Sequence, residues 1–221
     1  MAKSLKHIAL VVSLGTLASK IGGLARQLVI AAAFGIGAAY DAYNYAYILP
    51  GFFLVLLGGI NGPFHNAIVS VLSRKSKEES AYILSSINTL TSTLLFIITA
   101  ILFFSAEPII KTIGPGLSHD VHKLAVIQLQ IMAPIALFSG LIGIGFGTLN
   151  ANNQFFIPSI SPLLSSLILT SFVAIFWLQE GARIQSEQFE IKGGIILAIA
   201  TLIGAFIQWI IQLPALVNKG L

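Results

Sequence analysis

The sequence of 221 residues contains no cysteine, and only 9% of its residues are charged. Without cysteine, neither a disulfide framework nor a thiolate metal site can form. A soluble domain typically carries about one quarter charged residues. Here hydrophobic residues make up 56% of the chain, and the mean hydropathy is +0.92. The composition therefore predicts an integral membrane protein.

Recognisable catalytic motifs are also missing. The sequence holds no nucleotide-phosphate loop, catalytic triad or paired-carboxylate site. Its four histidines are scattered, and His119 and His122 lie among polar loop residues, which favours a solvated pair over a metal site. The net charge of +4 lies largely beside apolar segments, where it indicates topology rather than nucleic-acid binding. We expect no enzyme, cofactor, metal ion or nucleic-acid partner.

Six apolar segments each reach the length of about 20 residues that a helix needs to cross a bilayer. Helices are expected because an unpaired strand edge is not stable in lipid. The sequence thus predicts an all-α membrane protein with one domain over residues 1–221. Its six predicted transmembrane helices cover residues 8–34, 41–72, 81–105, 122–149, 155–178 and 193–216.

The distribution of Lys and Arg between the segments predicts the orientation. With the N-terminus inside, the cytoplasmic side carries six cations, namely Lys3, Lys6, Arg74, Lys75, Lys77 and Lys219. The opposite side carries four, which acidic residues dilute, namely Lys111, Lys123, Arg183 and Lys192. We expect a multi-pass protein of the bacterial plasma membrane with both termini in the cytoplasm.

Three ionisable residues fall within or at the edge of predicted spans. Lys20 lies about 12 residues, or about 18 Å, into the first span, followed by Arg26, and Asp41 opens the second. Such groups usually face a wet cavity or a partner. For Arg26 and Asp41 the alternative is snorkelling or a mutual ion pair. Two cations beside a flexible Gly-Gly pair, Gly22 and Gly23, indicate an anionic ligand such as phosphate.

The second predicted span is interrupted by three pairs of helix-breaking residues, Pro50-Gly51, Gly58-Gly59 and Gly62-Pro63. Broken helices at membrane depth typically line a cavity or move, although irregular packing is an alternative. We predict hinges or helix breaks at Gly22, Gly23, Pro50, Gly51, Gly62 and Pro63. Asn61 and His65 beside the last break are candidate headgroup contacts, with a structural role as the alternative for His65.

Two stretches resemble a known family. In "ASKIGGLARQLVIAAAFGIGAAYDAYNYAYILP" (18–50), Ser19, Lys20, Gly23 and Arg26 occupy a Ser-Arg-x-x-Gly-x-x-Arg pattern, with lysine in place of the first arginine. The second stretch is "GTLNANNQFFIPSISPLL" (147–164). Both are similar to the MurJ/MviN lipid II flippases of the multidrug/oligosaccharidyl-lipid/polysaccharide exporter superfamily, in a variant that resembles cyanobacterial members.

The resemblance implies a two-lobe transporter of which this chain is the N-terminal, six-span lobe, with a second lobe as its partner. It implies flipping of an undecaprenyl-pyrophosphate-linked peptidoglycan precursor, lipid II, by alternating access. Lys20, Arg26 and Asp41 would be cavity residues, with the cations on the pyrophosphate. Two alternatives stay open: an exporter of another lipid-linked oligosaccharide or amphipathic drug, or a non-transporting half-protein that needs a partner lobe.

Overall fold

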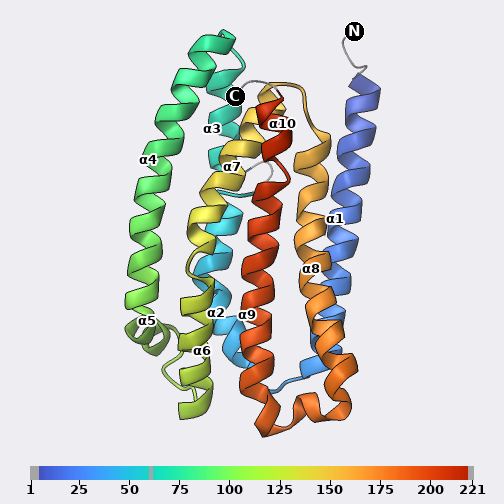
Figure 1. Ribbon diagram of the computed structural model, residues 1–221, viewed down its shortest axis with the longest axis vertical. Helices are drawn as coiled ribbons and strands as arrows, with labels where there is room; N and C mark the ends of the chain where they lie inside the picture. Colours follow the sequence, from blue (N-terminus) through green and yellow to red (C-terminus); the bar gives the residue numbers. More distant parts are fainter. Residues whose placement is uncertain (1–4, 60–61, 219–221) are drawn as a thin grey trace.

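The computed structural model describes residues 5–59 and 62–218, which form a long bundle of helices (Figure 1). No strand occurs among these residues, which confirms the predicted all-α class. The helices are α1 (Leu5–Phe34), α2 (Ala38–Leu56), α3 (Pro63–Leu72), α4 (Lys77–Phe104), α5 (Ala106–Ile113), α6 (His119–Met132), α7 (Ile135–Ala151), α8 (Phe156–Glu180), the 3₁₀ turn η1 (Gly181–Gln185), α9 (Glu187–Ile210) and α10 (Leu213–Val217).

The prediction of six transmembrane helices is wrong in one respect. Within the described residues, five helical segments are long and apolar enough to cross a membrane. The second predicted span is instead two shorter helices, α2 and α3, which follow one another along the bundle (Figure 1). The polar first half of α2, with Asp41 and Asn44, lowers its hydropathy, and the chain leaves the helix after Leu56.

The fourth predicted span also consists of two helices. α6 ends at Met132 and α7 begins at Ile135, with Pro134 between them. Proline lacks the N–H that would continue the ladder of hydrogen bonds, so a single proline is enough to divide the span. The two helices together still form one membrane-crossing segment, His119–Ala151.

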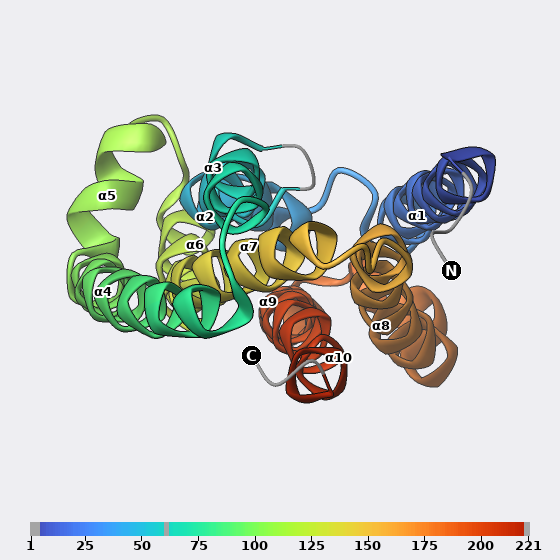
Figure 2. The same cartoon turned by 90° about the horizontal axis from the view of Figure 1, so that it is seen from above.

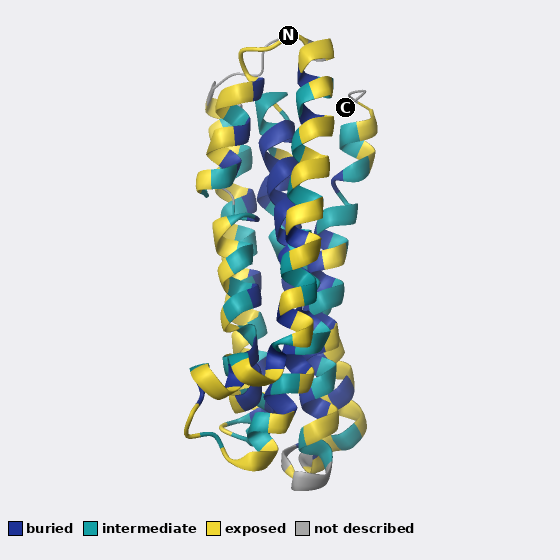
Figure 3. Cartoon of the chain, turned by 90° about the vertical axis from the view of Figure 1, so that its left-hand side faces the viewer, coloured by how far each residue is buried: buried dark blue, intermediate teal, exposed yellow. Residues whose placement is uncertain are grey.

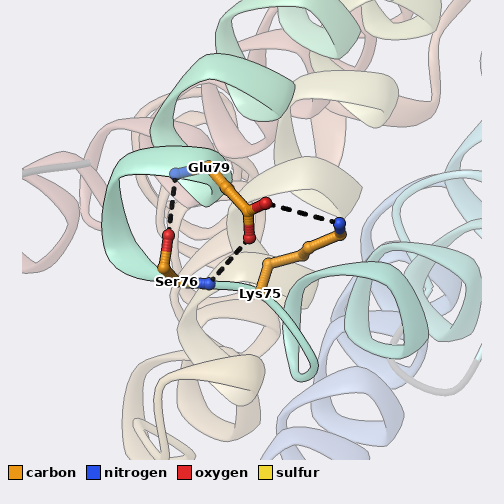
Figure 4. Close-up of polar contacts among 3 residues, drawn as sticks. All are labelled: Lys75, Ser76 and Glu79. Atoms are coloured by element: carbon orange, nitrogen blue, oxygen red, sulfur yellow. Dashed lines mark hydrogen bonds and ion pairs between the residues drawn. The ribbon is translucent and has the colours of Figure 1, made fainter.

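Local sequence signals explain where α4 begins (Figure 4). Ser76 is its N-cap, and the Ser76 Oγ accepts a hydrogen bond from the Glu79 backbone N–H at 3.3 Å. In return the Glu79 carboxylate accepts from the Ser76 N–H at 3.2 Å, which completes a capping box. Lys75 adds an exposed ion pair to Glu79, with 3.7 Å between Nζ and Oε1.

The start of α2 is held by a residue far along the chain. α1 ends at a left-handed glycine, Gly35, whose φ is +57°, and no side chain of the adjoining turn caps α2. The Glu190 carboxylate of α9 accepts a hydrogen bond from the Ala38 N–H at 3.2 Å. A carboxylate at a helix N-terminus also interacts favourably with the helix dipole. Glu190 therefore fixes one end of α2 against α9.

The bundle is built around α6 and α7 (Figure 2). Buried residues are concentrated in its central helices, whereas the outer helices carry most of the exposed positions (Figure 3). α1 lies at the edge and packs along α8. One face of α1 is typical of lipid contact, since it exposes six aliphatic side chains spaced three or four residues apart. These residues are Leu10, Leu14, Leu17, Ile21, Leu24 and Leu28.

Small residues of α7 allow the segment between α2 and α3 to approach closely. An ideal Cβ on Gly143 would collide with the Leu57 carbonyl oxygen, and one on Gly147 would lie 2.6 Å from the Ile68 side chain. Ser139 packs against Gly58 in the same way. A Cβ on Gly58 would lie 3.2 Å from the Ser139 carbonyl oxygen. This Ser139–Gly143–Gly147 face is a small-xxx-small surface against which the broken helix rests.

Candidate functional site

A cavity of about 700 Å³ lies between α1, the α2–α3 break, α8 and α9. Lys20 and Arg26 contribute its α1 wall, together with Thr16 and Ser19. The opposite wall includes Gly58, Gly59, Gly62 and Pro63, so described residues on both sides of the α2–α3 break border the cavity. Ser159, Pro162, Ser165 and Ser166 of α8 and Gln208 of α9 complete it.

The two cations of α1 differ in exposure. Lys20 is exposed, whereas Arg26 is half-buried. The Nε of Arg26 is fully buried and has no hydrogen-bond partner within the described residues. The ion pairs formed there are Lys75–Glu79 and Lys192–Glu180, so the alternative of an Arg26–Asp41 ion pair is not realised. Both cations therefore face the cavity without an acidic side chain to neutralise them.

A tyrosine platform lies beside Arg26. The Tyr43 hydroxyl donates to the Thr201 Oγ1 at 2.9 Å, because the Thr201 hydroxyl proton is already donated to the Leu197 carbonyl at 2.7 Å. Tyr47 stacks on Tyr43 with ring centroids 5.5 Å apart, and Tyr47 lines the cavity. The charge of Arg26 lies within electrostatic reach of both hydroxyl groups. The anchored Tyr43 thus holds Tyr47 in the cavity wall.

The beginning of α3 adds a further positive feature. Gly62 is its N-cap, Pro63 is in its first turn, and no side chain caps it. Because Gly62 and Pro63 line the cavity, the positive end of the α3 dipole lies at the cavity edge. Two cations and a helix N-terminus around one cavity suit a phosphate-bearing anion, through charge-assisted hydrogen bonds.

The remaining predicted contacts lie elsewhere or outside the described residues. Asp41 is exposed in the first turn of α2, where a carboxylate favours the helix dipole, and it is not among the cavity-lining residues. Asn61 lies outside the described part of the chain. A ligand role for Asp41 and Asn61 therefore stays a prediction.

His65 is buried between α3 and α7 rather than in the cavity wall. Its Nε2 lies 2.8 Å from the Asn150 Nδ2, and its Nδ1 lies 3.2 Å from the Asn66 Oδ1. Because an amide nitrogen only donates, Nε2 accepts and the imidazole is neutral, with Nδ1–H donating to Asn66. The contacts of His65 connect α3 to α7, and its role as a headgroup ligand stays a prediction.

Two of the predicted sites of a hinge or helix break do not interrupt a helix, and a hinge role for them stays a prediction. α2 continues through Pro50 and Gly51, and α1 continues through Gly22 and Gly23. Pro50 is buried among neighbouring helices, and such packing allows a membrane helix to keep an interior proline. Gly51 instead makes room for an aromatic ring, since its Cβ would lie 2.8 Å from the Tyr47 Cε1. The interruption of α2 falls after Leu56, and the chain becomes helical again at Pro63.

The two glycines of α1 have different surroundings, which gives a prediction. An ideal Cβ on Gly22 would collide with Leu163 of α8, whereas no atom lies within 4 Å of one on Gly23. We expect Gly22→Ala to change the midpoint of thermal unfolding in detergent little, because the end of the Leu163 side chain must adopt another rotamer and this offsets the gain in helix propensity. Gly23→Ala should raise stability by about 1 kcal/mol, because alanine is the better helix former. Equal effects of both substitutions on stability would contradict this assignment.

Sequence reasoning found the cations but missed the neutral polar wall. Ser165, Ser166 and Gln208 are uncharged residues in apolar spans, and Tyr47 lies in a polar, aromatic stretch of α2. The available signal was weak: Gln208 is a strongly polar side chain inside the otherwise apolar last span. Ser19 does more than line the cavity, since its hydroxyl donates to the Ser159 carbonyl at 2.8 Å and joins α1 to α8.

Comparison with known proteins gives consistent matches. The family described as "Lipid II flippase MurJ" matches residues 30–221. A "Probable lipid II flippase MurJ" from Synechocystis is 48% identical over 220 residues, which cover 100% of this chain and 41% of the relative. A "Lipid II flippase MurJ" from Thermosipho africanus is 33% identical over 166 residues, or 75% of this chain and 34% of the relative.

A solved structure of "Lipid II flippase MurJ, inward closed conformation" has the same fold, with a TM-score of 0.76 and 28% sequence identity. The match covers 95% of this chain and 42% of the solved chain. The chain therefore spans less than half the length of the proteins it matches. These findings confirm the family resemblance read from residues 18–50 and 147–164.

Proposed function

Because the chain belongs to the lipid II flippase MurJ family, we propose that it is the N-terminal lobe of a transporter that moves lipid II across the bacterial inner membrane. The chain spans 41% of the Synechocystis relative and 42% of the solved flippase, which fits one lobe of two. The transporter acts by alternating access, without covalent chemistry or cofactor, and a second lobe completes it.

One observation carries the proposal: Lys20 and Arg26 line the same cavity and form no ion pair within the described residues. Placing a cation at membrane depth costs about 2.5–3.5 kcal/mol on insertion scales, so such residues are usually functional. A pyrophosphate offers two adjacent anionic groups, and arginine binds phosphate through paired hydrogen bonds. We infer that the headgroup pyrophosphate binds against this wall.

The α2–α3 break supports a transport cycle. Its residues Gly58, Gly59 and Gly62 border the cavity and connect two short helices that pack on α7. Transporters commonly place interrupted helices at the substrate site, where a change in the backbone alters access. In this proposal α3 moves relative to α2 when the headgroup binds, and Gly62 and Pro63 act as the hinge.

Both termini are proposed to lie in the cytoplasm. α1 begins and α10 ends at the same end of the bundle as the turn between α3 and α4 (Figure 1). That turn contains Arg74 and Lys75. The natural chain has no cysteine, so single cysteines report on each end without background. A membrane-impermeant maleimide should label Gly116→Cys but not Ser73→Cys in intact spheroplasts. The reverse pattern would place the termini outside.

The function itself is tested by transplanting the lobe. In the Synechocystis relative, the matching 41% is replaced by this chain, and the chimera is expressed in a bacterium depleted of its own lipid II flippase. We expect the chimera to restore growth and the 221-residue chain alone not to do so. A chimera that inserts into the membrane but does not restore growth would contradict the proposal, as would full rescue by the lobe alone.

A further inference from the structure

Two neutral polar side chains in the cavity wall lack partners. Ser166 of α8 is 5% exposed and Gln208 of α9 is 8% exposed, and both line the cavity. Within the described part of the chain, neither the Ser166 hydroxyl nor the Gln208 side-chain amide forms a hydrogen bond. The fully buried side-chain atoms without a partner in the described residues include Ser161 Oγ and Gln212 Oε1 but no atom of Ser166 or Gln208, so the polar atoms of Ser166 and Gln208 reach the cavity space.

Three other buried hydroxyls of the bundle show the usual solution, whereas the Ser161 Oγ of α8 is fully buried without a partner among the described residues. Ser139, Thr148 and Thr201 each donate to a backbone carbonyl three or four residues earlier in their own helix, at 2.6–2.7 Å. This local bond satisfies a hydroxyl in an apolar environment. Ser166 does not use it, although it lies in the regular helix α8. Its hydroxyl is therefore free to bond a molecule in the cavity.

Both residues lie close to the cationic wall. An ideal Cβ on Gly22 would lie 3.8 Å from the Ser166 Cβ, which places Ser166 beside the turn of α1 that connects Lys20 and Arg26. On α9, a Cβ on Gly204 would lie 2.8 Å from the Ser165 Oγ, and Gln208 follows Gly204 by one turn on the same face. The neutral wall and the cations therefore border one space.

We propose that Ser166 and Gln208 form a neutral subsite that binds hydroxyl and amide groups of the headgroup attached to the pyrophosphate. An amide side chain both donates and accepts, and a hydroxyl does the same, so the pair matches the mixed donors and acceptors of a saccharide. The cations bind charge shared by all polyprenyl pyrophosphates, whereas this subsite discriminates among headgroups. The inference rests on the proposed function and extends it to substrate specificity.

The test uses the chain in lipid nanodiscs with three probes: lipid II, undecaprenyl pyrophosphate without a headgroup, and uncharged undecaprenol. The double variant Ser166→Ala with Gln208→Met removes the hydrogen-bonding atoms and largely preserves side-chain volume. We expect its affinity for lipid II to fall about tenfold, which corresponds to about 1.4 kcal/mol. Its affinity for undecaprenyl pyrophosphate should stay within about twofold of the wild type, because the phosphates bind elsewhere.

Matched substitutions control for general damage to α8 and α9. Ser161→Ala with Gln212→Met changes the same residue types at buried positions outside the cavity lining, Ser161 on α8 and Gln212 just after the end of α9. This control should keep the wild-type preference for lipid II. The unfolding midpoint of the Ser166 and Gln208 variant should be equal to or above that of the wild type, because neither removed polar group forms a hydrogen bond within the described residues.

The outcomes separate this inference from the proposed function. Retained preference for lipid II in the Ser166 and Gln208 variant would overturn the subsite. An equal loss of affinity for both pyrophosphate probes, with a lowered unfolding midpoint, would overturn it too by showing a structural role. The proposed function itself fails if the wild-type chain binds neither pyrophosphate probe more tightly than undecaprenol.

Discussion

Arg26→Gln is expected to lower the affinity of the chain for undecaprenyl pyrophosphate by about 10- to 100-fold, since each hydrogen bond to a charged group contributes about 1.5–3 kcal/mol. Glutamine keeps a donor and much of the length but removes the charge. The effect should exceed that of Lys20→Gln, because Arg26 is half-buried with a fully buried Nε, whereas Lys20 is exposed. A titration in nanodiscs measures both affinities.

Conservative variants separate charge from geometry. Lys20→Arg keeps the charge and adds the planar fork that binds phosphate through two hydrogen bonds, so it should bind at least as tightly as the wild type. Arg26→Lys keeps the charge and loses the fork, and it should fall between the wild type and Arg26→Gln. If Arg26→Gln bound undecaprenyl pyrophosphate with wild-type affinity, the pyrophosphate would not lie at Arg26.

In the chimera with the Synechocystis relative, Arg26→Gln should abolish rescue of flippase depletion while the protein still inserts into the membrane. Two other residues of the cavity lining, Leu54 and Val55, are apolar and cannot replace the positive charge that Arg26 provides. Lys20 remains as the second cation of the lining, and it is too exposed to bind a phosphate as strongly.

Much of the fold follows from the sequence because membrane insertion imposes simple rules. Apolar length predicts the spans, and the combination of Gly58-Gly59 with Gly62-Pro63 correctly indicates where the second span is interrupted. Pro50 gives the same local signal, yet α2 continues through it. The difference is tertiary: Pro50 is buried among packed helices, and packing is not visible in a local pattern.

The site residues also fall into two groups, those that the sequence predicts and those that only the structure reveals. Lys20 and Arg26 are recognisable because a charge at membrane depth is costly wherever the helix faces. Ser166 and Gln208 are not recognisable, because an uncharged polar residue in a span is often satisfied by its own helix, as Thr148 is. Only the three-dimensional arrangement distinguishes a hydroxyl bonded to its own backbone from one that faces a cavity.

The position of the α2–α3 break depends on α7. Within the described part of the segment between α2 and α3, Gly58, Gly59 and Gly62 contribute no side chains to hold it in place. It rests on the small-residue face of α7, and the same segment forms one wall of the cavity. Close packing on α7 therefore sets the shape of the proposed substrate site, although α7 itself is absent from the cavity lining.

Gly143→Ala is accordingly expected to destabilise the protein by about 1–3 kcal/mol, the usual cost of overpacking a well-packed core. The added Cβ would collide with the Leu57 carbonyl oxygen and lie 2.9 Å from the Leu57 carbonyl carbon and 3.0 Å from the Phe64 Cδ1. A backbone carbonyl cannot rotate away as a side chain can, so the break must move. For a chain of this size the unfolding midpoint should fall by several degrees.

Gly140→Ala is the matched control on the same helix. Its Cβ would meet the end of the Leu95 side chain, which can adopt another rotamer, so the unfolding midpoint should change little. Because Gly143 contacts the break and Gly140 does not, Gly143→Ala but not Gly140→Ala should also weaken binding of undecaprenyl pyrophosphate in nanodiscs. If Gly140→Ala reduced stability and binding as much as Gly143→Ala, general packing of α7 would explain both, and the specific support of the cavity wall would be refuted.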